Sequence, residues 1–176
     1  TLNNSTLAGN YAVQSGGGFS GVGPSINITL NNSLSYGNEA TNFPNSEGAY
    51  TSNNSLVGVN PSFNTLLDAS DNAPTTGGDY RLAHYSVAID AGDNALVPGG
   101  ITNDLLGFTR FYNDTGVTDT GLGTAPIVDM GAYEKQTNSP LVCGTAPDRI
   151  YELQDGGAKF GFAGPFTVDG VVTFDG

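Results

Sequence analysis

The chain has 176 residues, and its 17 Asp and Glu against five Lys and Arg give a formal net charge of −12. A chain this acidic repels a phosphate backbone, which excludes nucleic acid as a natural partner. Charged residues make up only 12% and glycine accounts for 26 positions. This composition is poor in helix formers, so we expect an all-β protein. No apolar run approaches the roughly 20 residues that cross a bilayer, so we expect no membrane span.

The stretch QSGGGFSG, residues 14–21, has the G-x-G-x-x-G spacing of dinucleotide-binding loops. Such a loop needs a helix after it, because the N–H groups at the start of that helix hold the phosphate. The residues that follow, VGPSINITLNN, contain a proline, β-branched side chains and clustered asparagines, so we expect no helix there. Gly16, Gly17 and Gly18 are therefore predicted to be turn glycines at a corner that requires positive φ or leaves no room for a Cβ.

An internal repeat occupies the first sixty residues. LNNSTLAGNYA at residues 2–12 and LNNSLSYGNEA at residues 30–40 share seven of eleven residues at a spacing of 28. A third, weaker copy, NNSLVGVN at residues 53–60, follows after a step of 22. Periods of this length, with short β segments and Asn or Gly corners, predict a solenoid whose coils stack through parallel strands.

Stacked coils place equivalent residues of each repeat above one another. Asn4, Asn32 and Asn54 are therefore predicted to form a ladder of hydrogen-bonded side-chain amides along the stacking axis. Leu2 and Leu30 should pair at the same level and point into the interior. Aromatic residues fall at no shared repeat position, which argues against a regular sugar-stacking face.

The pattern NNSTLAGNYAVQSGGGF resembles the repeats of right-handed parallel β-helix proteins of bacterial cell surfaces. The later strings NPSFN, GDYRLAHYSVAIDAGDN, NDLLGFTR and VDMGAYE are similar to the segment that closes such helices in large secreted bacterial proteins of the choice-of-anchor type. The resemblance covers residues 2–135, with Asn60 where Asp is usual and Val87 where Pro is usual. It implies an extracellular, right-handed parallel β-helix.

The two ends of the chain are expected to form different parts. Residues 1–135 are predicted to be β-helix coils and their closing segment. Residues 136–176 are predicted to be a linker followed by a small β appendage or the start of a further domain, because IYEL, AKFGF and VVTF are typical of short strands. Cys143 is the only cysteine, which excludes an internal disulfide and zinc sites of the multi-cysteine type.

Acidic residues gather where the resemblance is strongest. Two interpretations are open: oxygen ligands for Ca²⁺, or carboxylates that cap turns by accepting backbone N–H groups. We expect no other cofactor. Arg81 and Arg110 are expected to pair with these carboxylates. The candidate ligands are Asp90, Asp93, Asp104 and Asp129.

Two further residues are candidates for a role. Asn113 starts an N-x-T sequon in a polar loop, which makes it a glycosylation candidate. His84, the single histidine, lies between alternating apolar residues and is expected at a partly packed strand position.

These features predict a non-catalytic extracellular or cell-surface structural module, which associates with itself into filaments or mediates adhesion to other surface proteins. One alternative is a carbohydrate-binding or polysaccharide-cleaving β-helix with glycan partners. Another is an accessory subunit of a larger extracellular or membrane-bound assembly. Catalysis is disfavoured because the repeats contain only two acidic residues, Glu39 and Glu47, before residue 60, whereas glycosidases use paired carboxylates.

Overall fold

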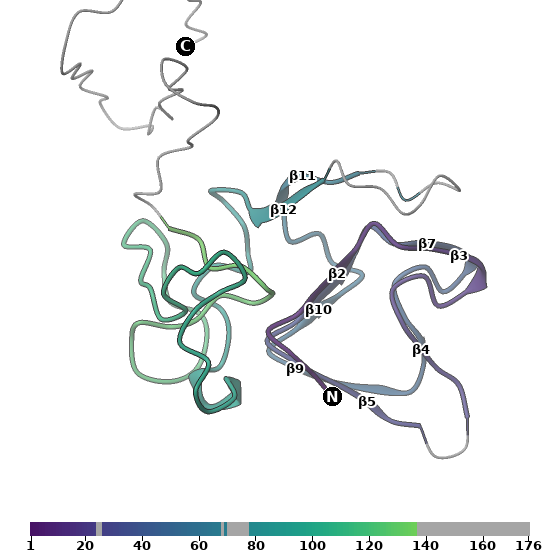
Figure 1. Ribbon diagram of the computed structural model, residues 1–176, viewed down its shortest axis with the longest axis horizontal. Helices are drawn as coiled ribbons and strands as arrows, with labels where there is room; N and C mark the ends of the chain where they lie inside the picture. Colours follow the sequence, from purple (N-terminus) through teal and green to yellow (C-terminus); the bar gives the residue numbers. More distant parts are fainter. Residues whose placement is uncertain (24–25, 68, 70–77, 137–176) are drawn as a thin grey trace, which may run out of the picture. The chain divides into compact units, whose positions relative to one another are not determined.

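Figure 1 shows the computed structural model of the protein, in which residues 1–23, 26–67, 69 and 78–136 are described. The chain divides into two units, Thr1–Thr137 and Asn138–Gly176, and all the described residues belong to the first. Cys143 and the strands expected beyond residue 136 lie outside the described residues.

Short strands form almost all of the regular structure within these ranges, as the composition predicts. Among the described residues, the only helical element is a single 3-10 turn, η1 (Asn94–Leu96), which Asp93 caps at its N-terminus. Three successive stretches of the chain, called here passes, contribute the parallel strands. The first pass contains β1 (Leu2–Asn3), β2 (Thr6–Ala8), β3 (Tyr11–Ser15) and β4 (Ser20–Gly21). The second contains β5 (Ile28–Asn31), β6 (Leu34–Tyr36), β7 (Glu39–Asn42) and β8 (Glu47–Gly48). The third contains β9 (Tyr50–Asn53) and β10 (Leu56–Val57).

Equivalent strands of successive passes pair in parallel. The sheets have the orders β1-β5-β9, β10-β6-β2, β3-β7 and β4-β8, and Figure 1 shows their strands superimposed around one outline. Leu2 is in register with Leu30, and Asn31 with Asn53. The spacings of 28 and 22 that the repeats predict are therefore confirmed as the register of strand pairing.

After the third pass, the strand pairing changes from parallel to antiparallel. Strand β11 (Phe63–Thr65) pairs antiparallel with β12 (Asp79–Leu82). His84 follows β12 in a turn, not in the strand position expected for it, and its ring packs edge-on against Tyr85 with 4.5 Å between centroids. The residue before His84, Ala83, still donates its backbone N–H to the carbonyl of Ser62 at 2.8 Å.

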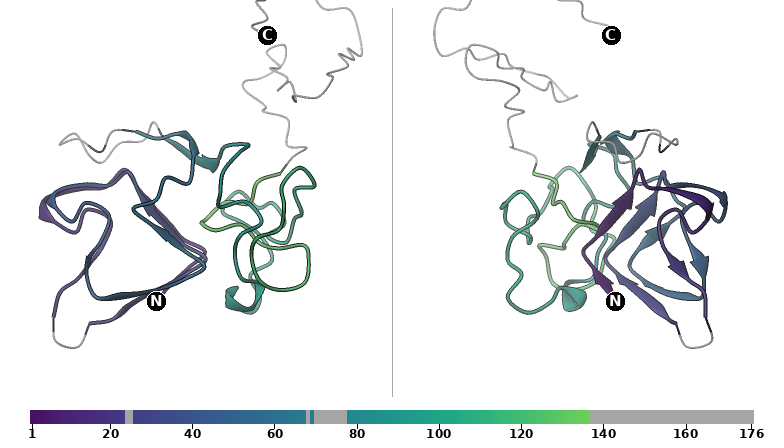
Figure 2. Two further views of the ribbon diagram at one scale, coloured as in Figure 1. Left: turned by 180° about the vertical axis from the view of Figure 1, so that it is seen from behind. Right: turned by 45° about the vertical axis from the view of Figure 1, so that its right-hand side comes forward.

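Residues 86–135, called here the closing segment, pack beside the corner between β5 and β6 (Figure 2). The amide of Gly131 donates to the carbonyl of Asn32, and that of Ala132 donates to the hydroxyl of Thr6. A Cβ on Gly131 would lie 2.8 Å from Leu34, so this contact requires glycine. The segment contains little regular structure, and turns and hydrogen bonds hold it together.

The main apolar core lies between the repeats and the closing segment. Leu34 of β6 and Leu82 of β12 meet Ile89 and Met130 there, and all four are buried. Burying a side chain of this size contributes about 1.5–3 kcal/mol. This shared core couples the closing segment to the repeats, and it places residues 88–91 and 127–130 at the centre of the unit.

Candidate functional site

The described part of the closing segment buries several ionisable groups, which form its most unusual chemistry. We call them the buried acidic cluster. Each member exposes 4% or less of its surface, whereas such residues are almost never buried unless they are paired. The members are Asp90, Asp114, Asp129, Glu134 and one cation, Arg110.

Asp129 links two distant parts of the segment through its carboxylate. Its Oδ1 accepts the backbone N–H of Asp90 at 2.7 Å, and its Oδ2 accepts that of Lys135 at 2.6 Å. Its own backbone N–H donates to both carboxylate oxygens of Glu134, at 3.2 and 3.3 Å. The motif VDMGAYE therefore folds back on itself, with each acid capping the backbone of another residue.

Arg110 is the only cation of the cluster. Its guanidinium lies 3.3 Å from Oε2 of Glu134 and donates to the carbonyls of Gly131 and Ala132, each at 3.1 Å. The backbone N–H of Glu134 in turn donates to Oδ2 of Asp104 at 3.0 Å. Arg110 thus connects its own loop to the C-terminal end of the closing segment.

Burial raises the pKa values of these acids. Desolvation raises the pKa of Asp129 to about 7, against the hydrogen bonds from Lys135 and Asp90 that favour its charged form. Desolvation, followed by repulsion from Asp129, raises the pKa of Glu134 to about 10, although Arg110 opposes the shift. With one guanidinium facing two carboxyl groups, the network holds at least one proton at neutral pH.

Asp90 sits at the centre of a second group of acids. Its backbone has a φ of 49°, unusual for a residue other than glycine. Its Oδ2 accepts the backbone N–H of Asp114 at 3.2 Å. Desolvation, then repulsion from Asp119 and Asp114, raises the pKa of Asp90 to about 6, and the hydrogen bond from Asp114 opposes this.

The four residues expected to bind calcium as a set have separate places. Asp93 is the N-cap of η1, where it accepts the N–H of Ala95. Asp104 accepts the N–H groups of Leu106 and Phe108 within a tight turn, at 2.9 and 2.8 Å. Among the described residues, no three His, Cys, Asp or Glu side chains come together to hold a metal ion. The carboxylate of each of the four accepts at least one backbone N–H group, and the two residues that meet are Asp90 and Asp129.

The asparagine ladder exists, but it runs through the residue before the one expected. The amide of Asn31 donates to Asn3, and that of Asn53 donates to Asn31, both at 2.8 Å. The prediction of a ladder through the next residue of each repeat is wrong. The physical reason is backbone geometry: these corner residues have left-handed φ values, which turn their side chains away from the stack. They are Asn4 (φ 43°), Asn32 (φ 47°) and Asn54 (φ 41°).

Two of the three corner asparagines, Asn32 and Asn54, form hydrogen bonds with the closing segment instead. The amide of Asn32 donates to the carbonyl of Asp93 at 2.8 Å and accepts the N–H of the same residue at 2.7 Å. Asn54 donates to the carbonyl of Ala91 at 3.2 Å. The Asn4 amide is buried and makes no hydrogen bond within the described residues. Asparagine suits these corners because it tolerates left-handed φ and carries a polar amide.

The turn glycines of residues 16–18 have the roles expected of them. Gly16 has a φ of +70°. A Cβ on Gly17 would lie 2.5 Å from the carbonyl oxygen of Pro44. A Cβ on Gly18 would collide with the carbonyl oxygen of Asn45. These glycines therefore let two passes approach closely.

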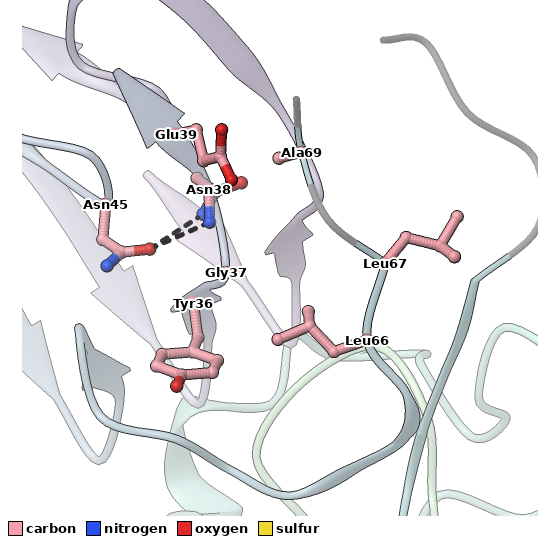
Figure 3. Close-up of a pocket in the computed structure, with 8 residues that line it drawn as sticks. All are labelled: Tyr36, Gly37, Asn38, Glu39, Asn45, Leu66, Leu67 and Ala69. Atoms are coloured by element: carbon pink, nitrogen blue, oxygen red, sulfur yellow. Dashed lines mark hydrogen bonds between the residues drawn. The ribbon is translucent and has the colours of Figure 1, made fainter. Parts of the chain in front are cut away.

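Shallow pockets open on the repeats in the described part of the chain. One, of about 290 Å³, has Tyr36, Asn38, Glu39 and Asn45 on one side and Leu66 on the other (Figure 3). The amide of Asn38 donates to Oδ1 of Asn45 within it, at 3.3 Å. The second pocket, of about 340 Å³, is bounded by residues of β3, β7 and β8, with a single acid, Glu47.

The remaining candidates are one asparagine and two arginines. Asn113 is exposed beside the buried Asp114. Arg81 pairs with Asp79 at 2.5 Å, and Arg110 pairs with Glu134, so both arginines pair with acids other than the four candidate ligands. Sequence reasoning missed Glu134 and Asp114. The signal for Glu134 was present in the VDMGAYE string, which places an acid five residues after Asp129.

No protein-family model, no curated protein and no solved structure matches the chain. Within the described residues, no helix is both long and apolar enough to cross a membrane.

Proposed function

We propose that this chain is a non-catalytic structural module of a secreted or cell-surface protein, folded as a right-handed parallel β-helix with its closing segment. The proposal rests on the observation that each residue of the repeated NNS tripeptide has a different structural role. In each pass the first Asn belongs to the ladder, the second turns the corner, and the Ser hydroxyl donates to the carbonyl of the first Asn at 2.8 Å. The serines are Ser5, Ser33 and Ser55.

The serines also join the passes to one another. The hydroxyl oxygen of Ser33 accepts the N–H of Ser5 at 3.1 Å, and that of Ser55 accepts the N–H of Ser33 at 2.8 Å. The most strongly repeated residues thus stabilise the stack, which leaves them no part in binding a substrate. This is the pattern expected where the repeat itself is the product of selection for a rigid scaffold.

The placement of the perturbed acids supports a non-catalytic role. A general acid must reach the atom that it protonates, but Asp129 and Glu134 are almost fully buried and engaged with backbone groups. Each repeat pocket contains one carboxylate, Glu39 or Glu47, whereas glycosidases use two. The shifted pKa values therefore fit a structural network better than an active site.

Self-association is the interaction that this architecture favours. Strands β1 and β9 are outer strands of their sheet, each with one partner among the described strands. Such strands can add a further strand from another molecule or from a neighbouring part of a longer polypeptide. We expect filaments or adhesive contacts with surface proteins to form through these edges.

Light scattering after size-exclusion chromatography tests the assembly. The chain should show a mass that rises with concentration, and Thr51→Lys on β9 should reduce it, because a charge on an edge strand blocks strand addition. Thr124→Lys, in the closing segment, is the matched control and should leave the mass unchanged. A monomer at every concentration would contradict self-association.

Carbohydrate binding is a second candidate, favoured by the pocket in Figure 3. It offers the ring of Tyr36 with the amides of Asn38 and Asn45 and the carboxylate of Glu39, the polar and aromatic groups that can orient a sugar. A glycan array followed by calorimetry would test it. Tyr36→Ala should abolish binding while Tyr85→Ala, at a 78% exposed position, should not; a binding signal that survives Tyr36→Ala would exclude this pocket.

A further inference from the structure

The loop of residues 114–121 encloses Asp90 from two sides. Its first residue, Asp114, donates a backbone N–H to Oδ2 of Asp90 at 3.2 Å. Its last two, Thr120 and Gly121, donate to the backbone carbonyl of Asp90 at 2.9 and 3.0 Å. The arrangement brings the carboxylates of Asp90 and Asp114 together, and Asp119 is near enough to repel Asp90.

Two carboxylate oxygens inside this loop have no partner. Oδ1 of Asp90 and Oδ2 of Asp114 are buried and accept no hydrogen bond from the described residues. Their residues expose 0% and 1% of their surface. Leaving a charged oxygen buried and unpaired costs more than the roughly 1–3 kcal/mol of a neutral group, so native structures rarely keep such atoms.

The described arginines do not supply a counter-charge to these atoms. Arg110 is bonded to Glu134 and to the carbonyls of Gly131 and Ala132. Arg81 is paired with Asp79 beside β12. The other buried carboxylates of the segment, those of Asp104, Asp129 and Glu134, accept backbone N–H groups with both oxygens. The two orphan oxygens are therefore a local exception in a segment that otherwise satisfies its acids.

The geometry points to a Ca²⁺ site under the 114–121 loop, with Oδ1 of Asp90 and Oδ2 of Asp114 as its two buried ligands. The site shares only Asp90 with the four residues expected from the sequence. Both ligand atoms are hard carboxylate oxygens, the type that Ca²⁺ prefers, and Ca²⁺ completes its six to eight ligands with backbone carbonyls and water.

Access and charge both favour a cation there. Asp119 and most of the loop around it are exposed, which gives an entry path, and the Asp119 carboxylate adds attraction for a cation from solvent. Two buried carboxylates are a low charge count for calcium, so the expected affinity is in the weak range of extracellular modules, on the order of 10⁻⁴ to 10⁻³ M. Mg²⁺ should bind less well, because it dehydrates reluctantly.

The test is calcium titration of the full chain after treatment with a chelator. Calorimetry should show saturable binding of one Ca²⁺ per chain, and the melting temperature should rise with CaCl₂ because the ion binds only the folded state. Asp114→Asn should weaken binding by roughly tenfold or more, as ligand-shell changes do. This variant keeps the Oδ1 that accepts the N–H of Gly116 at 3.0 Å, so it should fold.

Three comparisons make the result decisive. Without calcium, Asp114→Asn should melt at or above the temperature of the wild type, because its amide can donate to the orphan oxygen of Asp90. Asp119→Asn, at an exposed position, should weaken binding several-fold. Asp93→Asn is the matched control, since asparagine also caps a helix, and should bind as the wild type does.

Three outcomes would overturn the proposal. The first is no saturable binding up to about 10 mM Ca²⁺, above the weakest extracellular modules. The second is unchanged affinity in Asp114→Asn. The third is a melting temperature of the wild type that does not rise with CaCl₂.

Discussion

The side-chain amide of Asn31 donates a 2.8 Å hydrogen bond to Oδ1 of Asn3, which lies one pass earlier in the chain. Oδ1 of Asn31 also accepts from the amide of Asn53, so the middle residue is bonded on both sides. Asn31→Ala should remove both bonds and lower the free energy of unfolding by about 1–2 kcal/mol, since each is worth about 1 kcal/mol net. Urea denaturation measures the change.

Asn32→Ala should lower the free energy of unfolding by more than Asn31→Ala does, although the two asparagines are neighbours in the chain. Asn32 is fully buried and makes two hydrogen bonds to the backbone of Asp93, so truncation leaves a buried carbonyl and N–H unpaired at about 1–3 kcal/mol each. Alanine is also disfavoured by roughly 1–2 kcal/mol at left-handed φ. Equal losses in the two variants would show that the closing segment does not depend on this corner.

Gly17→Ala tests the close approach of two passes. The added Cβ would meet the backbone carbonyls of Glu39 and Pro44, which cannot move without disturbing the sheet. We expect a loss of about 1–3 kcal/mol or more in the free energy of unfolding. Gly99→Ala is the control, because nothing lies within 4 Å of its Cβ position, and its midpoint in a urea titration should match that of the wild type.

The sequence predicts the strand register because the same residues recur at fixed spacings, and a one-residue slip would break every pair. It does not decide which of two adjacent asparagines forms the ladder. That choice depends on the φ of the second residue, which is set by the turn and by contacts with Asp93, 61 positions away. Local pattern therefore fixes the repeat, while a long-range contact decides the direction of the Asn32 side chain.

The buried acidic cluster was predicted only in part, for a similar reason. Asp90 and Asp129 stand out in the sequence because they lie in the motifs AIDAGD and VDMGAYE. Their partners come from loops whose sequences show no repeat. Arg110 is 24 residues from Glu134, and Asp114 is 24 residues from Asp90. Only folding brings them together, so sequence spacing could not separate a single four-residue calcium site from several turn caps.

The stability of the protein should fall as pH rises through the neutral range. The folded-state pKa values of Asp129, about 7, and Glu134, about 10, lie above the ordinary values of 3.8 and 4.5. The folded chain thus holds protons that the unfolded chain releases. Each such proton lowers the free energy of unfolding by about 1.4 kcal/mol per pH unit, from about pH 4 up to the folded-state pKa.

Urea denaturation across this pH range measures the slope. Glu134→Gln should flatten it above about pH 7, where Asp129 is already ionised and Glu134 still holds its proton. Glu47→Gln is the control, because Glu47 lies on β8 and its Oε2 accepts a hydrogen bond from Ser20 outside the buried cluster. A wild type whose stability rises between pH 5 and 9, or a Glu134→Gln variant with the wild-type slope, would show that Glu134 is ionised at neutral pH.

Arg110 should contribute strongly to the stability of the closing segment even beside a protonated Glu134. Arg110→Met leaves the backbone carbonyls of Gly131 and Ala132 without their donor, in a site where the side chains of Arg110 and Glu134 are almost fully buried. Leaving a buried carbonyl unpaired costs about 1–3 kcal/mol, so the two together should cost several kcal/mol. Arg81→Met, which breaks a pair with 41% and 30% of its side chains exposed, should cost less than about 1 kcal/mol.

A double-mutant cycle isolates the coupling. Glu134→Gln keeps an oxygen to accept the N–H of Asp129 and, because Glu134 holds its proton at neutral pH, removes no charge that faces Arg110. At pH 7 the losses in Arg110→Met and Glu134→Gln should therefore add in the double variant to within about 0.5 kcal/mol, with Arg110 acting through the carbonyls of Gly131 and Ala132. A coupling of about 0.5–3 kcal/mol would mean that Glu134 is ionised beside Arg110, and would contradict the pH prediction.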